Sequence, residues 1–166
     1  MEKTVYKGNI LKVTEEEIDG IVWEKVYLPS GVIVFPITDD GKIMLIKEKR
    51  PHETPNVRIK PVSGILEPEK GTPEENAQRE MQEEIGYKAR EMKEILVLKG
   101  TGTVTHLQYF FVARGLTHSK LPNPDGDIIE AIIEYTPDEL RRALEKEEIK
   151  WSMSTLGLFR LLDSLG

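Results

Sequence analysis

The chain has 166 residues, 39% of them hydrophobic, and a formal net charge of −6. This length is enough for one packed core, so we expect a single α/β domain over residues 1–166, with residues 1–30 as an N-terminal element. The negative charge argues against a general nucleic-acid-binding surface. No apolar run approaches the roughly 20 residues of a membrane span, and the lack of cysteine excludes disulfides and thiolate metal sites. We therefore expect a cytoplasmic protein.

The first predicted elements are strands. The segment "GNILKVTEEEIDGIVWEKV" (8–26) predicts an N-terminal hairpin ahead of the main sheet. The runs "VIVFPIT" and "KIMLIKE" follow, separated by Asp39, Asp40 and Gly41. Because Asp-Gly tolerates the positive φ of a tight turn, this pair predicts a second hairpin. Further strands are predicted at "ILVLKG", "THLQYFFVARG" and "IIEAIIEY".

Two helices are predicted by the same start signal. Thr72 and Thr136 each precede a proline and two acidic residues, which is the pattern of a threonine N-cap with a capping box. A third helix, "STLGLFRLLDSL" (154–165), carries an apolar stripe that we expect to dock on the core. Strands, one helix, more strands and then helices favour a mixed sheet with helices packed on it.

Three glutamates in "REMQEEIG" lie within one sector of the first predicted helix: Glu80, Glu83 and Glu84. Like charges at this spacing repel one another, and a bound cation would remove the repulsion. Carboxylates without cysteine or clustered histidine form an all-oxygen site that suits Mg²⁺ or Mn²⁺. The alternative is an ordinary charged helix face exposed to solvent.

Glycines bracket this helix. Gly64 lies in the preceding loop, "KPVSGILEPEKG" (60–71), and would let backbone approach backbone or ligand closely. Gly86 stands where a helix needs a left-handed C-cap. Loop, helix and glycine stop therefore predict one compact unit.

This unit resembles the Nudix box. The family pattern is a glycine, five residues, Glu, seven residues, and then Arg-Glu-aliphatic-x-Glu-Glu-x-Gly-aliphatic, and the matching segment is "GILEPEKGTPEENAQREMQEEIGY" (64–87). Residues 79–86 match every fixed position, whereas Tyr87 replaces the last aliphatic residue. We therefore predict a member of the Nudix family.

The first half of the box departs from the pattern. One extra residue separates Gly64 from Arg79, so counting back from Arg79 puts Gly71 where the family has its first glutamate. Glu67 and Glu69 are nearby but out of register. That glutamate is usually a structural partner of the box arginine, so the departure puts the anchoring of Arg79 in question.

The resemblance implies an α/β/α sandwich with a mixed sheet and an N-terminal β-hairpin extension. It also implies hydrolysis of the pyrophosphate bond in a nucleoside diphosphate linked to another group. The implied metal ligands are Glu80, Glu83 and Glu84, and the implied catalytic residues are Arg79, Glu83, Glu84 and an acidic residue of a later loop. Candidates for this last residue are Asp125, Asp127 and, best placed before the second helix, Glu130, although a solvated turn would also explain them.

Candidate substrate-binding residues are Gly64, Arg50 and Trp23. Arg50, in "KEKR", resembles the position of a phosphate-contacting arginine in ADP-ribose-type members, and a surface salt bridge would explain it nearly as well. Trp23, like Tyr27, could stack on a base, although strand packing is the commoner role of such residues.

The N-terminal hairpin, "KEKR", "YFFVARGL" and the C-terminal tail resemble the ADP-ribose or nucleotide-sugar branch. Members of this branch commonly dimerise through exchanged N-terminal strands, so we expect a homodimer acting on a small nucleoside diphosphate derivative. The alternatives are a pyrophosphohydrolase of nucleoside triphosphates or RNA 5′ ends, and a non-catalytic nucleotide-binding module.

Overall fold

The computed structural model describes residues 1–100, 102–124, 126, 128–149 and 151–165. None of the helices in these residues is long and apolar enough to cross a membrane. The helices are η1 (Pro68–Lys70, 3-10), α1 (Pro73–Glu84), α2 (Pro137–Glu145) and α3 (Ser152–Leu165). The strands are β1 (Lys3–Lys7), β2 (Lys12–Ile18), β3 (Ile21–Tyr27), β4 (Gly31–Pro36), β5 (Ile43–Lys49), β6 (Val57–Lys60), β7 (Val62–Ile65), β8 (Tyr87–Lys99), β9 (Val104–Thr105), β10 (Leu107–His118) and β11 (Ile128–Tyr135).

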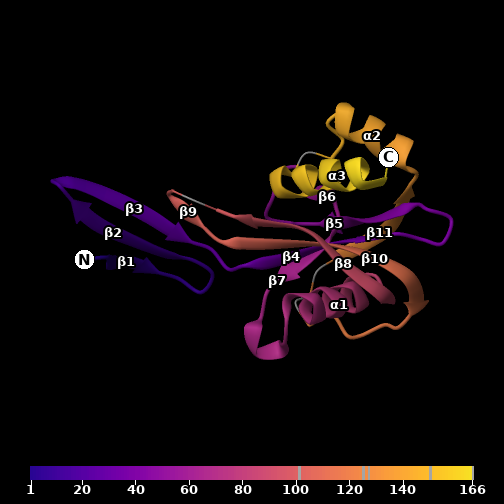
Figure 1. The fold of residues 1–166 in the computed structure, drawn as a ribbon, viewed down its shortest axis with the longest axis horizontal. Coiled ribbons are helices and arrows are strands. Elements are labelled where there is room, and N and C mark those ends of the chain that lie inside the picture. Colours follow the sequence, from indigo (N-terminus) through magenta and orange to yellow (C-terminus); the bar gives the residue numbers. More distant parts are fainter. Residues whose placement is uncertain (101, 125, 127, 150, 166) are drawn as a thin grey trace.

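The body of the molecule has three layers (Figure 1). One sheet has the order β7-β4-β10-β8 and the other β11-β5-β6, and only the β4–β10 pair within them is parallel. Helix α1 covers one side of these sheets, and α2 and α3 cover the other. The predicted α/β/α sandwich with a mixed sheet is confirmed.

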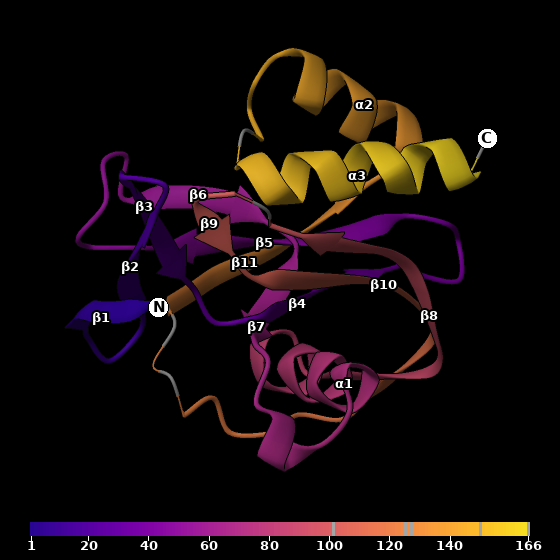
Figure 2. The same ribbon diagram turned by 60° about the vertical axis from the view of Figure 1, so that its left-hand side comes forward.

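A separate sheet of order β1-β2-β3-β9 extends away from this body (Figure 1). Strands β2 and β3 form the predicted N-terminal hairpin in continuous antiparallel register, with Ile18 opposite Ile21. Strand β1, which was not predicted from the sequence, pairs with β2 at one edge of this sheet. At the other edge, β9 pairs with β3 in parallel. The view in Figure 2 brings this sheet forward.

The second predicted hairpin is correct at its turn and wrong for its strands. The turn closes with hydrogen bonds from Thr38 N to Lys42 O (2.9 Å) and from Gly41 N to Thr38 O (2.9 Å). Beyond it, only an isolated bridge between Ile37 and Ile43 links the two segments. Strand β4 is buried along its whole length, and its two edges are taken by β7 and β10. It therefore has no edge left for β5, which pairs with β6 and β11 instead.

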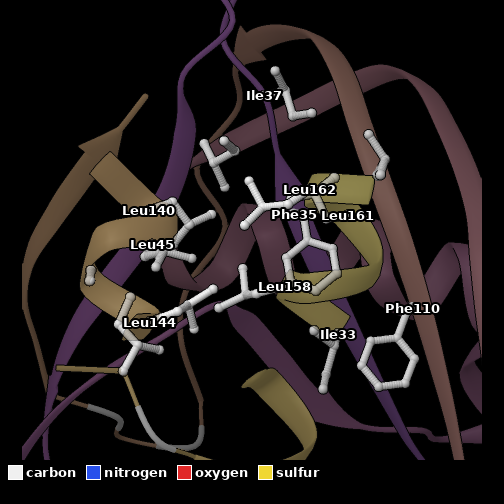
Figure 3. Packing of buried hydrophobic residues seen from close by; sticks show 14 residues of the cluster. Ile33, Phe35, Ile37, Leu45, Phe110, Leu140, Leu144, Leu158, Leu161 and Leu162 are labelled. Carbon is white, nitrogen blue, oxygen red and sulfur yellow. The ribbon is translucent and has the colours of Figure 1, made fainter. Parts of the chain in front are cut away.

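Side-chain alternation along β4 divides the core into two clusters. Ile33 and Phe35 pack against α2 and α3, together with Leu140, Leu158 and Leu161 (Figure 3). The intervening Val32 and Val34 face the opposite way, into the cluster beneath α1. The central strand thus fixes the position of α1 relative to the rest of the molecule.

Both predicted helix starts are confirmed. Thr72 and Thr136 are N-caps with complete capping boxes, in which Glu75 and Glu139 reach back to the cap backbone. Gly86 follows α1 with φ +78°, the left-handed conformation expected there. The third helix docks on the core as predicted and approaches it closely, because a Cβ on Gly157 would lie 2.5 Å from the Phe110 ring.

Candidate functional site

The three glutamates of α1 are buried, not displayed to solvent. Glu80, Glu83 and Glu84 are 6%, 7% and 5% exposed. The helix packs on the sheet through Ala77 and Met81, both fully buried, so the carboxylates are drawn down beside the core. A charged helix face in solvent, the alternative reading of this pattern, does not describe them. Buried carboxylates need partners of opposite charge or hydrogen-bond donors.

Glu84 is paired with a buried lysine. Lys60, at the end of β6, is 1% exposed, and its Nζ donates to Glu84 Oε1 at 2.9 Å. The backbone N–H of Ser63 donates to Glu84 Oε2 at 3.0 Å, and Lys60 also donates to Ser63 Oγ. The β6–β7 corner therefore holds Glu84 in a fixed orientation.

Lys60 also lies near a further carboxylate, that of Glu48 on β5, which is fully buried. Its Oε2 accepts from Arg58 Nε (2.7 Å) and Arg50 Nε (3.0 Å), and its Oε1 lies 3.7 Å from Lys60 Nζ. Burial alone would raise the pKa of Glu48, but Lys60, Arg50 and Arg58 together bring that pKa below its ordinary value of 4.5. Glu48 is therefore an ionised hub that gathers three cations beside the site.

Arg79 is anchored despite the altered motif. Its Nη2 lies 2.8 Å from Glu67 Oε2, and its Nη1 lies 3.4 Å from Glu80 Oε1 and 3.5 Å from Glu83 Oε2. A hydrogen bond from Lys70, together with the charge of Arg79, lowers the pKa of Glu67 and keeps it ionised. Glu67, which is out of register with the motif, thus supplies the partner that Gly71 cannot.

Gly64 makes room for Glu80. A Cβ built on Gly64 would lie 2.1 Å from Glu80 Cδ and less than 2.5 Å from both carboxylate oxygens. The absence of a side chain at this position lets the loop backbone lie directly against the carboxylate. Gly64 is therefore required by the position of Glu80.

Within the part of the chain that the structure describes, no three acidic or histidine side chains converge as a ready-made metal site. The donors nevertheless suit a hard divalent ion in kind, since they are carboxylates beside a loop whose backbone can approach closely. Because Gly64 has no side chain, the loop backbone comes close to the Glu80 carboxylate. The chemistry of these donors therefore fits a divalent cation.

A pocket of about 630 Å³ opens beside Glu80. Arg50 and Gly64, two of the three predicted substrate-binding residues, line it. Trp23, the third, is 54% exposed on β3 and is not among the lining residues of this pocket. Tyr27 lies on the same strand as Trp23. Its hydroxyl donates a hydrogen bond to Glu2, and the Lys12 ammonium lies 4.2 Å from the centroid of its ring.

Glu130 faces a second pocket, of about 510 Å³, which Glu84 also lines. The register of β11 against β5 shifts between Ile129 and Ala131, so Glu130 sits at a β-bulge, a feature that re-aims side chains near functional sites. Its Oε2 lies 3.1 Å from Lys47 Nζ. The other two acidic candidates, Asp125 and Asp127, lie outside the described residues.

Several residues of the site were not singled out from the sequence. Trp151 lines the larger pocket and stacks on Arg58, whose Cζ lies 3.8 Å from the ring centroid. His106 and Gln108 line the same pocket from the start of β10. Neither Lys60 nor Glu48 belongs to a recognisable sequence motif. The pairing of β5 with β6 is what brings the two side chains together. Trp151 directly precedes α3, but no pattern in the sequence links it to the pocket.

Comparisons with known proteins identify the family. The NUDIX domain family matches residues 27–155. The chain is 27% identical to the ADP-ribose pyrophosphatase of Bacillus subtilis (strain 168), over 89% of this chain and 83% of that protein. It is 28% identical to the methanol dehydrogenase activator of Bacillus methanolicus, over 93% and 86% of the two chains. The crystal structure of an ADP compounds hydrolase superposes with a TM-score of 0.83 at 20% identity, over 99% of this chain and 91% of that one.

The chain therefore belongs to the Nudix family, as its sequence predicts. The similarity to an ADP-ribose pyrophosphatase supports the predicted enzyme class.

The contact between Gly64 and Glu80 generates a first prediction. Gly64→Ala places a methyl group where the Glu80 carboxylate lies, so Glu80 must move and divalent-metal affinity falls. We expect the Kd for Mn²⁺, measured by calorimetry, to rise about 10-fold or more, as for other changes that misorient a metal ligand. Ile65→Ala, at the exposed neighbouring position, is the control and leaves the Kd unchanged. An unaltered Kd in Gly64→Ala would contradict this role of the glycine.

The charge cluster around Glu48 generates a pH prediction. Because the pKa of Glu48 is lowered on folding, its ionisation stabilises the protein above pH 4.5, and this contribution is lost as the pH falls through the folded-state pKa. Glu48→Gln lacks the contribution at every pH. Urea unfolding should show a constant stability difference between wild type and Glu48→Gln from pH 7 to about pH 5 that shrinks below pH 4.5. A difference that does not change with pH would show that Glu48 is not ionised in the folded state.

Proposed function

We propose that this chain hydrolyses the pyrophosphate bond of ADP-ribose or of a closely related nucleotide sugar. The observation that carries the proposal is the set of buried glutamates on α1, one of which, Glu80, lines a pocket large enough for a nucleotide. The similarity to an ADP-ribose pyrophosphatase along most of both chains supports the substrate class.

We assign Glu80, Glu83 and Glu84 to hold Mg²⁺, or Mn²⁺, against the substrate. A divalent ion there would neutralise phosphate charge and lower the pKa of a bound water. Glu84 is held in place by Lys60 and Ser63, while Arg79 lies within 3.5 Å of both Glu80 and Glu83. These contacts orient the carboxylates before substrate arrives, which limits reorganisation during the reaction.

Arg50 is the proposed phosphate-binding residue of the larger pocket. Its guanidinium is tied to Glu48 through Nε, an arrangement that fixes the direction of the side chain at the pocket wall. A planar fork of donors matches two phosphate oxygens. In the same pocket, Trp151 offers an aromatic face on which a base can stack, whereas Trp23 would require approach from another direction.

Glu130 is the proposed general base. It shares a pocket with Glu84 and is 34% exposed, so water reaches it. Lys47 Nζ lies 3.1 Å from Oε2 and holds the carboxylate in this direction. The β-bulge turns this side chain out of the regular alternation of β11.

The first functional prediction is metal-dependent turnover. Purified protein incubated with Mg²⁺ and a panel of ADP-ribose, nucleotide sugars, nucleoside triphosphates and triphosphate-ended RNA should release AMP and ribose 5-phosphate from ADP-ribose. Glu83→Gln and Glu84→Gln remove one charge each at nearly constant shape, and we expect each to lower kcat about 10²-fold or more. Phosphate-product chromatography measures both outcomes.

The panel also separates the alternatives. Faster turnover of triphosphates or RNA ends than of ADP-ribose would identify the other enzyme class. No turnover of any compound, with Mg²⁺ binding unchanged in both glutamate variants, would leave a non-catalytic nucleotide-binding module. Glu74→Gln on the first turn of the same helix is the matched control, because Glu74 is exposed.

We also propose a homodimer that forms through the N-terminal sheet, with residues 1–166 of each copy forming one Nudix domain and residues 1–30 the contact element. The hairpin of β2 and β3 exposes four large apolar side chains, Ile18, Ile21, Val22 and Trp23, each 49–58% exposed. By strand alternation, Ile18, Ile21 and Trp23 share one face of the hairpin, and an exposed apolar face of this kind favours a protein contact. The cytoplasmic location stays a prediction from the sequence.

Light scattering tests the dimer. The wild-type protein should have twice the 18.9 kDa mass of the chain. The double variant Ile21→Glu/Trp23→Glu should be a monomer, because burying two carboxylates in an apolar contact is unfavourable. Leu156→Glu, at an exposed position of α3, is the control, and this variant should stay dimeric. A wild-type monomer at high concentration would refute the dimer.

A further inference from the structure

The loop before α1 is tied to the helix by one buried side chain, that of Asn76. Asn76 is fully buried on the first turn of the helix. Its Nδ2 donates to three carbonyls of the loop, Glu67 O (3.2 Å), Gly71 O (3.1 Å) and Thr72 O (3.0 Å). A buried amide with this many partners holds the loop in one conformation.

The same side chain also reaches Arg79. Asn76 Oδ1 accepts from Arg79 Nη2 at 2.7 Å and from the backbone N–H of Glu67 at 3.1 Å. The Glu67 carboxylate lies 2.8 Å from the same Nη2. Nη2 is thus held from two sides, while Nη1 points to Glu80 and Glu83.

We infer that Asn76 and Glu67 form a clamp that positions Arg79 and, through it, the carboxylates of Glu80 and Glu83. Both are positioning residues, since neither lines the pocket beside Glu80. The inference rests on the proposed function, because it gives the metal-binding carboxylates their orientation. The role of Asn76 is indicated by neither the motif nor the pocket, and it is Asn76 that holds the loop from which Glu67 reaches Arg79.

The backbone at Gly71 explains why the clamp lies where it does. Gly71 has φ +129°, and a Cβ there would lie 2.4 Å from Glu75 Oε2, which closes the capping box of α1. A side chain at position 71 would be strained and would collide with the cap. A carboxylate for Arg79 must therefore come from elsewhere in the loop, and η1 turns the chain so that Glu67 reaches it.

Three variants test the clamp. Glu67→Ala removes the carboxylate, Glu67→Gln removes only its charge, and Asn76→Ala removes the amide. Glu69→Ala is the control, since Glu69 is exposed in the same loop. We expect the Kd for Mn²⁺ to rise about 10- to 100-fold in Glu67→Ala and Asn76→Ala, less in Glu67→Gln, and not in Glu69→Ala. The KM at saturating Mn²⁺ should stay unchanged, because the clamp does not touch the pocket.

A spectroscopic readout follows the clamp without metal or substrate. In wild type, the Arg79 Nε–H should give a resolved resonance in nitrogen–proton spectra because the guanidinium is held on both sides. Assignment uses Arg79→Lys. In Glu67→Ala and Asn76→Ala, the resonance should broaden or merge with those of the exposed arginines. If Asn76→Ala does not fold, Glu67→Ala, at a partly exposed position, carries the test.

The outcomes separate this inference from the proposed function. Absence of turnover on all substrates, with the Arg79 resonance and the Mn²⁺ Kd both changed by Glu67→Ala, removes the function and leaves the clamp. Turnover in wild type, with Glu67→Ala and Asn76→Ala matching Glu69→Ala in Kd and in the Arg79 resonance, overturns the clamp and leaves the function.

Discussion

The buried ion pair between Lys60 and Glu84 is the contact on which the rest of the site depends. Transferring either ion from water into the protein costs several kcal/mol unless the other is present. Four glutamates are buried among the described residues, Glu48, Glu80, Glu83 and Glu84, against a single buried ammonium. The guanidiniums of Arg50, Arg58 and Arg79 approach from the boundary of the core and supply the remaining positive charge. The arrangement tolerates negative charge on α1 only because β5 and β6 bring cations to it.

This charge balance also sets the polarity of the two pockets. Cations accompany the carboxylates on the side of β5 and β6, and the larger pocket opens there, lined by Arg50 and Lys60. The second pocket lies at the C-terminal end of α1, where Glu84 and Glu130 share a wall. A phosphate group seated between these openings would meet positive side chains at one end and a proton acceptor at the other. The core beneath α2 and α3 is built mainly from apolar side chains and contributes rigidity to this frame.

Local signals in the sequence predict the frame well. A threonine cap, a proline and an acidic residue are neighbours along the chain, so α1 and α2 begin where their sequences indicate. The burial of Glu80, Glu83 and Glu84 follows from their position beside an apolar stripe. Contacts between distant segments are not encoded in this way. Lys60 and Glu84 are 24 residues apart, and no pattern in the sequence states that β6 ends against the last turn of α1. The separation of β4 from β5 was missed for the same reason, since it depends on the competing partners β7 and β10.

The altered Nudix box shows why a motif spacing is only a proxy for a contact. Counting residues back from Arg79 leads to Gly71 and suggests that the arginine has lost its partner. In the folded chain, the 3-10 helix η1 shortens the loop and accommodates the extra residue. The Glu67 carboxylate therefore lies 2.8 Å from the Arg79 guanidinium. What the site requires is a carboxylate at that point, from any position whose backbone can supply it. Since Asn76 fixes the loop carbonyls at the same time, an insertion in the motif is compatible with an intact arrangement of Arg79, Glu80 and Glu83.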